Sequence, residues 1–346
     1  MSVFQSMVKK EALHLVRDLR TLLIVLIMPM VLLLLFGFAI STEVNNVRVA
    51  AVVDRYDDGT RRALARIGEN PYFTFAGVVA PGEPEAMMRR GEIDAAVVFH
   101  GGGRQVIVDA SNTTSAQAAA AYLEGVLSSE SSESAQVLTS TMYNPQLKSA
   151  YNFVPGVMGM IFILICAMMT SVSIVSEKER GTMDLLSVSP VNPQTVILGK
   201  LVPYLVLSCI ILSTMLLLAY TVLGLPYSPA VVNVVWISLL YIALSLGFGL
   251  LISSVVNTQV TALLVSGVLF MIPVIMLSGM IFPIDNMPKV LQWLSCIIPA
   301  RWYISAMRAL MIQQLPVSYV MTEVAVLGTM AAFVLLLAVK QLKTRR

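Results

Sequence analysis

Six stretches of the chain consist almost entirely of apolar residues, and each is long enough to cross a membrane as a helix. An α-helix rises about 1.5 Å per residue, so about 20 residues span the roughly 30 Å of hydrocarbon in a bilayer. The stretches cover residues 21–40, 154–175, 196–220, 231–252, 260–282 and 317–339. The pattern predicts an α-helical polytopic membrane protein with six transmembrane helices. The first stretch is too long for a signal peptide, and no small-x-small cleavage site follows it.

Residues 41–153, between the first two predicted spans, have the polar and apolar pattern of an ordinary globular domain. Short β-branched runs that predict strands alternate with segments of helical periodicity. The predicted strands cover residues 47–53, 73–79, 93–99 and 105–108, and the predicted helices cover residues 60–67, 84–90 and 113–127. We therefore expect a small inserted domain of α/β or α+β architecture.

Residues 283–316, before the last span, are apolar but interrupted. The two apolar runs, 290–298 and 302–312, are each too short to cross a bilayer, and Pro299 separates them. Trp302 carries the kind of amphipathic ring that favours the level of the lipid headgroups. We expect a re-entrant helical hairpin that enters the outer leaflet.

The N-terminal residues 1–20 form a further amphipathic segment. Apolar side chains recur there at helical spacing, and basic side chains lie away from that stripe. The stripe comprises Phe4, Met7, Val8, Ala12, Leu15, Val16 and Leu19. Two interpretations remain open: a helix that lies in the cytoplasmic membrane interface, or a simple anchor for the first span.

Composition and charge fix the class and the orientation that we expect. Of the 346 residues 57% are hydrophobic and only 12% are charged, which excludes a wholly soluble enzyme, and a net charge of +3 gives no indication of nucleic-acid binding. Basic residues next to spans remain in the cytoplasm. They are Lys9, Lys10, Arg17 and Arg20; Lys178, Arg180 and Lys200; and Lys340, Lys343, Arg345 and Arg346. We therefore expect cytoplasmic termini, including the tail 340–346, and an extracytoplasmic domain 41–153.

Enzymatic motifs are missing from the sequence. Gly199-Lys200 is followed by Leu201 instead of Ser or Thr, so it is not a nucleotide-binding loop, and no G-x-S-x-G nucleophile motif occurs. The chain has only two histidines, one on each side of the membrane in the expected topology, so a histidine metal site is not supported. We expect a chain that is not an enzyme and binds no cofactor of its own.

Two features of the spans could belong to a transport pathway. Glu323 lies in the last span, where an acid costs about 2.5–3.5 kcal/mol at the bilayer centre, so it is either a pathway residue or a hydrated acid near the membrane surface. Methionines in the second and fifth spans suit a pathway for varied apolar ligands, or equally lipid contact and helix packing. The candidates are Met160, Met168, Met271 and Met276.

A charged turn directly follows the second span and leads into a short amphipathic segment that ends at Pro190. Its candidate residues are Glu177, Lys178, Glu179, Arg180, Gly181, Thr182, Asp184, Leu185 and Leu186. Such a segment, within the cytoplasmic connection 176–195, could insert into a groove on another protein. The alternative is a polar loop that only joins two helices.

At this segment the chain resembles the membrane subunits of ABC-2-type transporters, whose pattern E-K-E-R-G-T, an acid, paired leucines and Ser-x-Pro is matched at residues 177–190. Residues 277–288 look like the family's outer turn after the fifth span. Pro299, Arg301, Trp302 and Arg308 look like its re-entrant segment. The stretch 109–112 is similar to one in the subfamily with a large outer domain between spans one and two.

The resemblance implies an exporter permease in the bacterial inner (plasma) membrane. ATP and Mg²⁺ would bind to a separate ATPase subunit, with residues 176–195 as the coupling helix beneath a homodimer or a heterodimer with a similar permease. Whether a periplasmic adaptor also takes part is left open. The sequence does not identify the substrate, although the methionine-rich spans favour an amphiphilic one. The alternatives are a secondary transporter, which would need repeats and paired intramembrane charges, and a sensor, which would need a cytoplasmic output domain.

Overall fold

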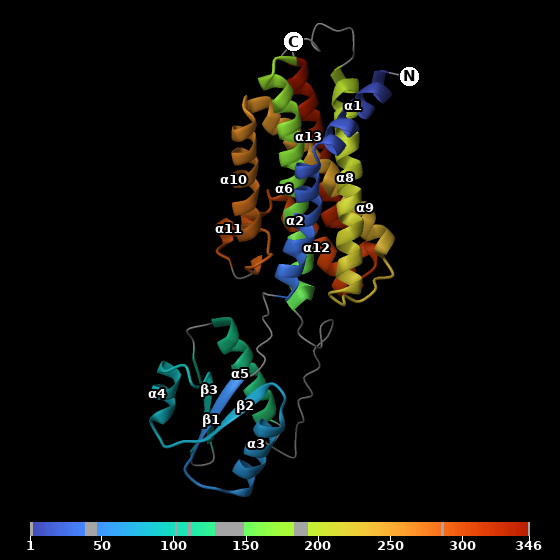
Figure 1. Cartoon of the computed structure of the whole chain (residues 1–346). Helices are drawn as coiled ribbons and strands as arrows, with labels where there is room; N and C mark the ends of the chain where they lie inside the picture. The colour runs from blue at the N-terminus through green and yellow to red at the C-terminus, as the bar shows by residue number, and fades with distance from the viewer. Residues whose placement is uncertain are drawn as a thin grey trace. The chain divides into compact units, whose positions relative to one another are not determined.

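The computed structural model describes residues 3–38, 47–100, 103–109, 113–128, 149–182, 193–284 and 287–344. The chain divides into two compact units, one formed by Met1–Ile40 with Ser149–Arg346 and the other by Ser41–Lys148 (Figure 1).

The first unit is a bundle of long helices. Its main members are α1 (Val3–Arg17), α2 (Leu19–Phe38), α6 (Ser149–Glu179), α8 (Pro193–Thr221), α9 (Val231–Val255), α10 (Gln259–Leu277) and α13 (Met321–Thr344). Six helical segments are long and apolar enough to cross a membrane: Leu19–Phe38, Ala150–Glu179, Leu198–Thr221, Val231–Val255, Gln259–Leu277 and Val317–Ala338. The six predicted spans are therefore confirmed as helices in the part of the chain that the structure describes.

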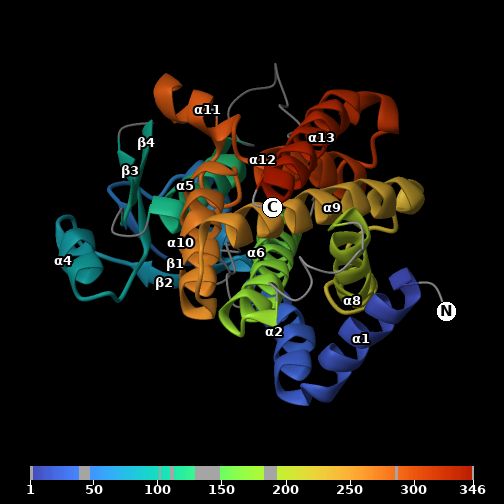
Figure 2. The same cartoon turned by 90° about the horizontal axis from the view of Figure 1, so that it is seen from above.

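Helix α6 is the centre of this bundle. It packs against α2, α8, α9 and α10, which surround it when the bundle is viewed along its length (Figure 2). The approach of α9 is close, because a Cβ at Gly249 would lie 2.6 Å from the Cβ of Thr170 and 2.7 Å from the backbone oxygen of Ala167. Small residues at helix crossings allow such close packing inside membranes.

Two buried tyrosines inside the bundle are hydrogen-bonded to neighbouring helices. The Tyr241 and Tyr303 rings stack with centroids 4.3 Å apart. The Tyr241 hydroxyl donates to the backbone oxygen of Gly159 at 2.9 Å, and the Tyr303 hydroxyl lies 2.9 Å from that of Ser238. Because buried hydroxyls are costly without partners, these bonds fix how α6, α9 and the segment before α13 fit together.

The fifth span is shorter than the sequence pattern predicts. Residues 260–282 were expected to form one helix, but α10 ends at Leu277. Gly279 has a φ of +80°, in the left-handed region that ends helices, and Pro283 follows. The apolar residues after Leu277 could continue the helix, but the left-handed conformation of Gly279 ends it.

The segment 283–316 contains the two short helices that the pattern predicts. They are α11 (Lys289–Ser295) and α12 (Pro299–Met307), and α12 continues into a π-helix, Arg308–Ile312. A 3₁₀ helix, Val317–Val320, then precedes α13. Their entry into a membrane leaflet stays a prediction.

In the described part of the second unit, the strands form a four-stranded sheet with helices on both faces. The strands β1 (Val47–Val53), β2 (Phe73–Val78), β3 (Ala95–His100) and β4 (Gly103–Val108) lie in the order β2-β1-β3-β4. Strand β1 is parallel to β2 and β3, and β4 is antiparallel to β3. This confirms the predicted small domain of strands and helices, whereas its extracytoplasmic location stays a prediction.

Alternate residues of β1 face different helices, as the two-residue period of a strand requires. Val47, Val49 and Ala51 pack with α3 (Asp58–Glu69) and α5 (Thr113–Ser128), and Ala50 packs with α4 (Glu83–Arg89) on the opposite face. The sheet is therefore the middle layer of three.

An ion pair fixes the start of β1 to the turn before β3. Arg48 Nη2 lies 2.8 Å from Asp94 Oδ1, and both Arg48 Nε and its backbone N–H donate to Asp94 Oδ2. The side-chain hydrogen bond from Arg48 is the main cause that lowers the pKa of Asp94 below its ordinary value. The carboxylate is thus charged, and paired, at neutral pH.

Candidate functional site

Helix α1 packs on α8 through its apolar stripe. A Cβ at Gly199 of α8 would lie only 3.0 Å from the Cβ of Met7, and Leu15 packs against the bundle core. Glu11 lies on the same stripe, four residues from each of these two side chains, and is only 5% exposed. A carboxylate at this position needs partners, because burial of an unpaired charge is costly.

The partners of Glu11 come from two other helices. Ser173 of α6 donates its hydroxyl to Glu11 Oε1 at 2.5 Å, and the Tyr204 hydroxyl of α8 donates to the same oxygen at 3.3 Å. Lys200 Nζ, also on α8, lies 3.5 Å from Glu11 Oε1. The carboxylate therefore connects α1 to both α6 and α8.

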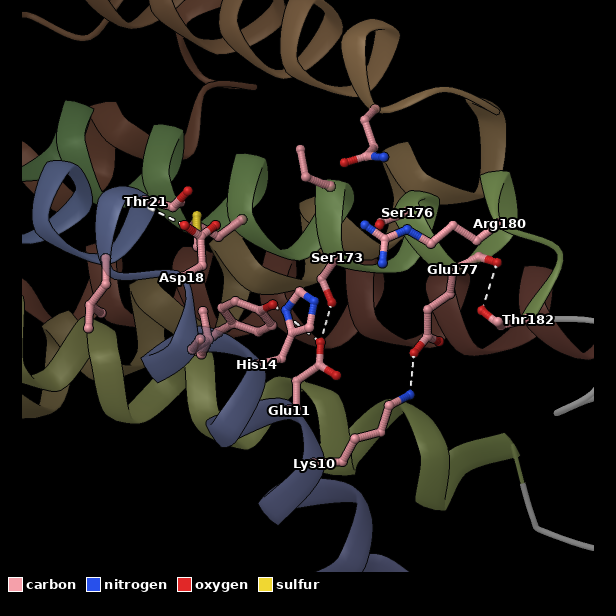
Figure 3. Close-up of a pocket in the computed structure, with 16 residues that line it drawn as sticks. Lys10, Glu11, His14, Asp18, Thr21, Ser173, Ser176, Glu177, Arg180 and Thr182 are labelled. Carbon is pink, nitrogen blue, oxygen red and sulfur yellow. Dashed lines mark hydrogen bonds and ion pairs between the residues drawn. The ribbon is translucent and has the colours of Figure 1, made fainter.

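Lys200 extends this connection to the end of α6. Its side chain is only 7% exposed, and its Nζ lies 3.0 Å from Glu177 Oε2. These two atoms have no well-aligned hydrogen bond within the described residues, so the contact is held by charge. Glu177 Oε1 in turn accepts from Lys10 Nζ at 2.8 Å (Figure 3).

We call Lys10, Glu11, Glu177 and Lys200 the ion-pair network. It contains two cations and two anions, so it is neutral as a whole. Lys10 is mostly exposed and the other three side chains are largely buried. A buried ion pair adds little net stability, but loss of one partner leaves an uncompensated charge. The network therefore fixes the position of α1 more than it stabilises the fold.

The network borders a cavity of about 420 Å³ between α1, the end of α6 and the start of α2. Figure 3 shows Lys10, Glu11 and His14 on α1 facing Ser173 and Glu177 on α6. Among the residues that the structure describes, no group of three or more His, Cys, Asp or Glu side chains could hold a metal ion.

The first three residues of the charged turn 177–182 contact other helices of the bundle. Lys178 Nζ donates to the backbone oxygens of Ser253 and Val256 at the end of α9, at 3.1 and 2.9 Å. Glu179 Oε2 accepts from the backbone N–H and the side-chain amide of Gln259 at the start of α10. Together with Glu177, these residues bind α1, α8, α9 and α10 to one short turn.

The turn itself is closed locally. Thr182 donates its hydroxyl to the backbone oxygen of Glu177 at 3.1 Å, and Gly181 has a φ of +72°, which favours glycine. Arg180 is exposed beside the cavity. Asp184, Leu185 and Leu186 lie outside the described residues, so the predicted coupling helix stays a prediction.

The candidate pathway residues, four methionines and Glu323, do not lie together in one place. Met160 is 6% exposed in the bundle core and Met168 is half-buried, whereas Met271 and Met276 are 48% and 47% exposed on α10. Glu323 lies in the first turn of α13 and accepts a hydrogen bond from the Ser305 hydroxyl at 3.0 Å. The methionines are thus divided between a packed interior and an open helix face.

The residues of the predicted re-entrant segment also have defined places. Pro299 begins α12, where its missing N–H costs nothing. Arg301 donates to the backbone oxygen of Gln292 at 2.9 Å and lies over the Trp302 ring, and Trp302 Nε1 donates to the backbone oxygen of Cys296. Arg308 begins the π-helix.

Sequence reasoning missed most of the ion-pair network. It chose Glu177 and used Lys10 and Lys200 only as topology markers, and it did not choose Glu11, Ser173 or Tyr204. A signal was available, because Glu11 interrupts the apolar stripe of a helix and Lys200 lies inside an apolar run. Two opposite charges on apolar faces indicate a buried pair.

The six long apolar helices among the described residues make this chain a multi-pass membrane protein. A sequence profile described as ABC-2 family transporter protein matches residues 19–340. The chain belongs to this family, whose membrane subunits are the permeases of ABC transporters and work with an ATPase partner.

The similar proteins agree. The chain is 30% identical to the probable multidrug ABC transporter permease YbhS of Escherichia coli K12, over 97% of this chain and 95% of that protein. It is 28% identical to the probable multidrug ABC transporter permease YbhR of the same strain, over 86% of each chain. A shorter similarity, 25% identity over 53% of this chain and 47% of the relative, is to the linearmycin resistance permease protein LnrN of Bacillus subtilis.

Proposed function

We propose that the chain is the permease subunit of an exporter for amphiphilic molecules, and that the energy comes from ATP hydrolysis on a separate ATPase subunit. ATP and Mg²⁺ would bind there and not to this chain, whose sequence has no nucleotide-binding loop. The names of two relatives refer to multidrug transport and linearmycin resistance, which supports export, and the exposed Met271 and Met276 of α10 suit an amphiphilic cargo.

The observation that carries the proposal is the position of the charged turn. Residues 177–182 contact α1, α8, α9 and α10 through Glu177, Lys178 and Glu179. A protein that binds the segment after this turn and moves it would pull on four helices at once. We infer that the segment is the coupling helix and that the ion-pair network makes α1 move with it.

The orientation follows from the same assignment. The end of the bundle with the network faces the cytoplasm, where an ATPase has access to ATP, and the α/β unit is on the outer side. Two permease copies, identical or merely similar, share the pathway between them. The α/β unit covers the exit or binds a periplasmic adaptor.

The test is the ATP hydrolysis of the permease and its ATPase, assembled together in lipid nanodiscs. Wild-type permease is expected to change the hydrolysis rate of the ATPase. Lys200→Met is expected to leave ATPase binding intact but to remove most of this effect, because the network no longer connects the turn to α1. Lys9→Met, which removes a neighbouring exposed lysine, serves as the control and should behave as the wild type.

The proposal fails if the Lys200→Met complex couples as well as the wild type. It also fails if wild-type permease neither binds the ATPase nor changes its rate.

A further inference from the structure

The bundle has a second cavity, of about 510 Å³, away from the ion-pair network. The turn after α10, helix α12, the π-helix and the start of α13 form its walls. Its lining combines apolar and charged side chains, including Arg301, Trp302, Ser305, Arg308, Tyr319 and Glu323. A cavity of this size suits a small ligand or the polar end of a larger one.

Arg308 brings a positive charge into this cavity without an anionic partner among the described residues. Its Nη2 donates to Asn152 Oδ1 and to the backbone oxygen of Gly279, each at 2.8 Å, and both acceptors are neutral. Its Nε is buried and has no hydrogen bond within the described part of the chain. A guanidinium carries five N–H donors, so this one has donors to spare.

The second arginine is also surrounded by neutral groups. Arg301 donates to the backbone oxygen of Gln292 and to the Ser295 hydroxyl, and it lies 5.1 Å from the centre of the Trp302 ring. The acid of the cavity, Glu323, accepts from Ser305 and has no ion pair with either arginine among the described contacts. Two cations against one anion leave the lining with a net positive charge.

The backbone around the cavity is irregular where it places Arg308. Arg308 is the first residue of a π-helix, and Gln314, just beyond it, has a φ of +53°, which is uncommon for a residue other than glycine. Such π-helical turns occur frequently at functional sites. Gly279, with its positive φ, directs its carbonyl oxygen to the guanidinium. The cation at Arg308 is thus held by backbone that departs from regular α-helix.

We propose that this cavity binds the anionic oxygen-rich group, a phosphate or a carboxylate, of an amphiphile. Arg308 supplies the main contact and Arg301 a second positive charge, because guanidinium groups are suited to phosphate and carboxylate oxygens. Trp302 and Tyr319 contact the beginning of the apolar chain. Glu323, which also lines the cavity, makes it unfavourable for a second negative group.

The ligand is either a membrane lipid or the exported molecule. Only in the second case does the inference rest on the proposed export function, whose substrate class it would then name.

The experiment measures binding to the purified permease in a neutral detergent, by native mass spectrometry. Dodecyl phosphate and dodecyl maltoside share one apolar chain and differ in charge. The wild type is expected to bind dodecyl phosphate at least tenfold more tightly than dodecyl maltoside. Arg308→Gln should remove this preference, and Lys289→Gln, which removes an exposed charge outside the cavity lining, should keep it.

Two further variants serve as controls. One tests whether a structural change alone removes the preference, and the other tests whether an acid of the chain already neutralises Arg308. Asn152→Ala removes a partner of Arg308 but no charge, so it should keep the preference for phosphate. Asp285, which lies outside the described residues, follows Ile284 of the cavity lining in sequence. If the preference appears only in Asp285→Asn, the site is internally neutralised and the proposal is wrong.

A diacyl phosphatidylglycerol distinguishes the two sources. Much tighter binding of this lipid than of dodecyl phosphate identifies a lipid site, and equal or weaker binding identifies a site for single-chain cargo. Equal affinity of the wild type for dodecyl phosphate and dodecyl maltoside overturns the inference, as does an Arg308→Gln variant that keeps the preference. This binding measurement does not depend on the ATPase. If the anion site is not found, the proposed function is therefore not affected.

Discussion

Replacement of Lys200 by methionine removes the cation that lies between two buried carboxylates. The Lys200 and Glu11 side chains are each 7% exposed, so water cannot replace the lost partner well. Glu177 keeps Lys10, but Glu11 keeps only the hydroxyls of Ser173 and Tyr204. Loss of one partner of a buried ion pair costs about 3–5 kcal/mol.

The cost should be felt first by α1, because Glu11 is its main polar contact with α6 and α8. A loss of about 3 kcal/mol increases local opening roughly a hundredfold, since about 1.4 kcal/mol corresponds to a factor of ten. The measurement is the hydrogen exchange of the α1 amides in the full-length permease in detergent. Exchange in the α/β unit should not change.

A second substitution, at Glu11, measures how strongly this carboxylate and Lys200 are coupled. Glu11→Gln alone leaves Lys200 paired with Glu177 and is expected to cost about 1–3 kcal/mol. The double variant restores a neutral network, so its cost should be clearly smaller than the sum of the two single costs. Lys9→Met is the control. Unchanged exchange of α1 in Lys200→Met, or additive costs in the double variant, would refute the buried ion-pair account.

Three further predictions concern packing, pH and topology. Gly249→Ala should destabilise the bundle by about 1–3 kcal/mol through a helix-crossing clash, whereas Gly267→Ala, which meets nothing within 4 Å, should be neutral or stabilising, as thermal unfolding would show. The lowered pKa of Asp94 means that its ion pair stabilises the α/β unit above the ordinary carboxyl pKa of about 4 and is lost as the pH falls through the lowered value. Asp94→Asn should therefore weaken strand protection at pH 7 and flatten its decline in acid, as hydrogen exchange over a pH series would show. In a variant without native cysteines, a cysteine in place of Glu85 should react with an impermeant maleimide on intact cells and one in place of Thr344 should not; the reverse would overturn the orientation.

The spanning helices could be predicted from the sequence because hydrocarbon leaves few alternatives. About 20 consecutive apolar residues must satisfy their backbone groups internally, so a helix is the expected result. The end of the fifth span was misplaced for a local reason. Residues 278–282 are apolar enough to continue it, but Gly279 adopts a left-handed conformation and α10 ends at Leu277.

The ion-pair network was harder to predict because its partners are far apart in sequence. Ser173 and Glu11 are separated by 162 positions, and Tyr204 and Glu11 by 193. A sequence pattern shows that Glu11 lies on an apolar face, but only the packing of α1 on α8 shows what meets it. The same holds for Arg308, whose partners Asn152 and Gly279 come from α6 and from the turn after α10.

Co-purification shows whether an ATPase subunit binds the segment that begins at Glu177, as we propose. Leu185→Asp with Leu186→Asp would place carboxylates in an apolar groove, at a cost of several kcal/mol of association. The same leucines replaced by methionine should keep the groove filled and the complex intact. We predict a double aspartate variant that inserts and elutes as a single species but no longer retains the ATPase. Full ATPase binding and full ATP-driven transport in that variant would show that the segment is only a connecting loop.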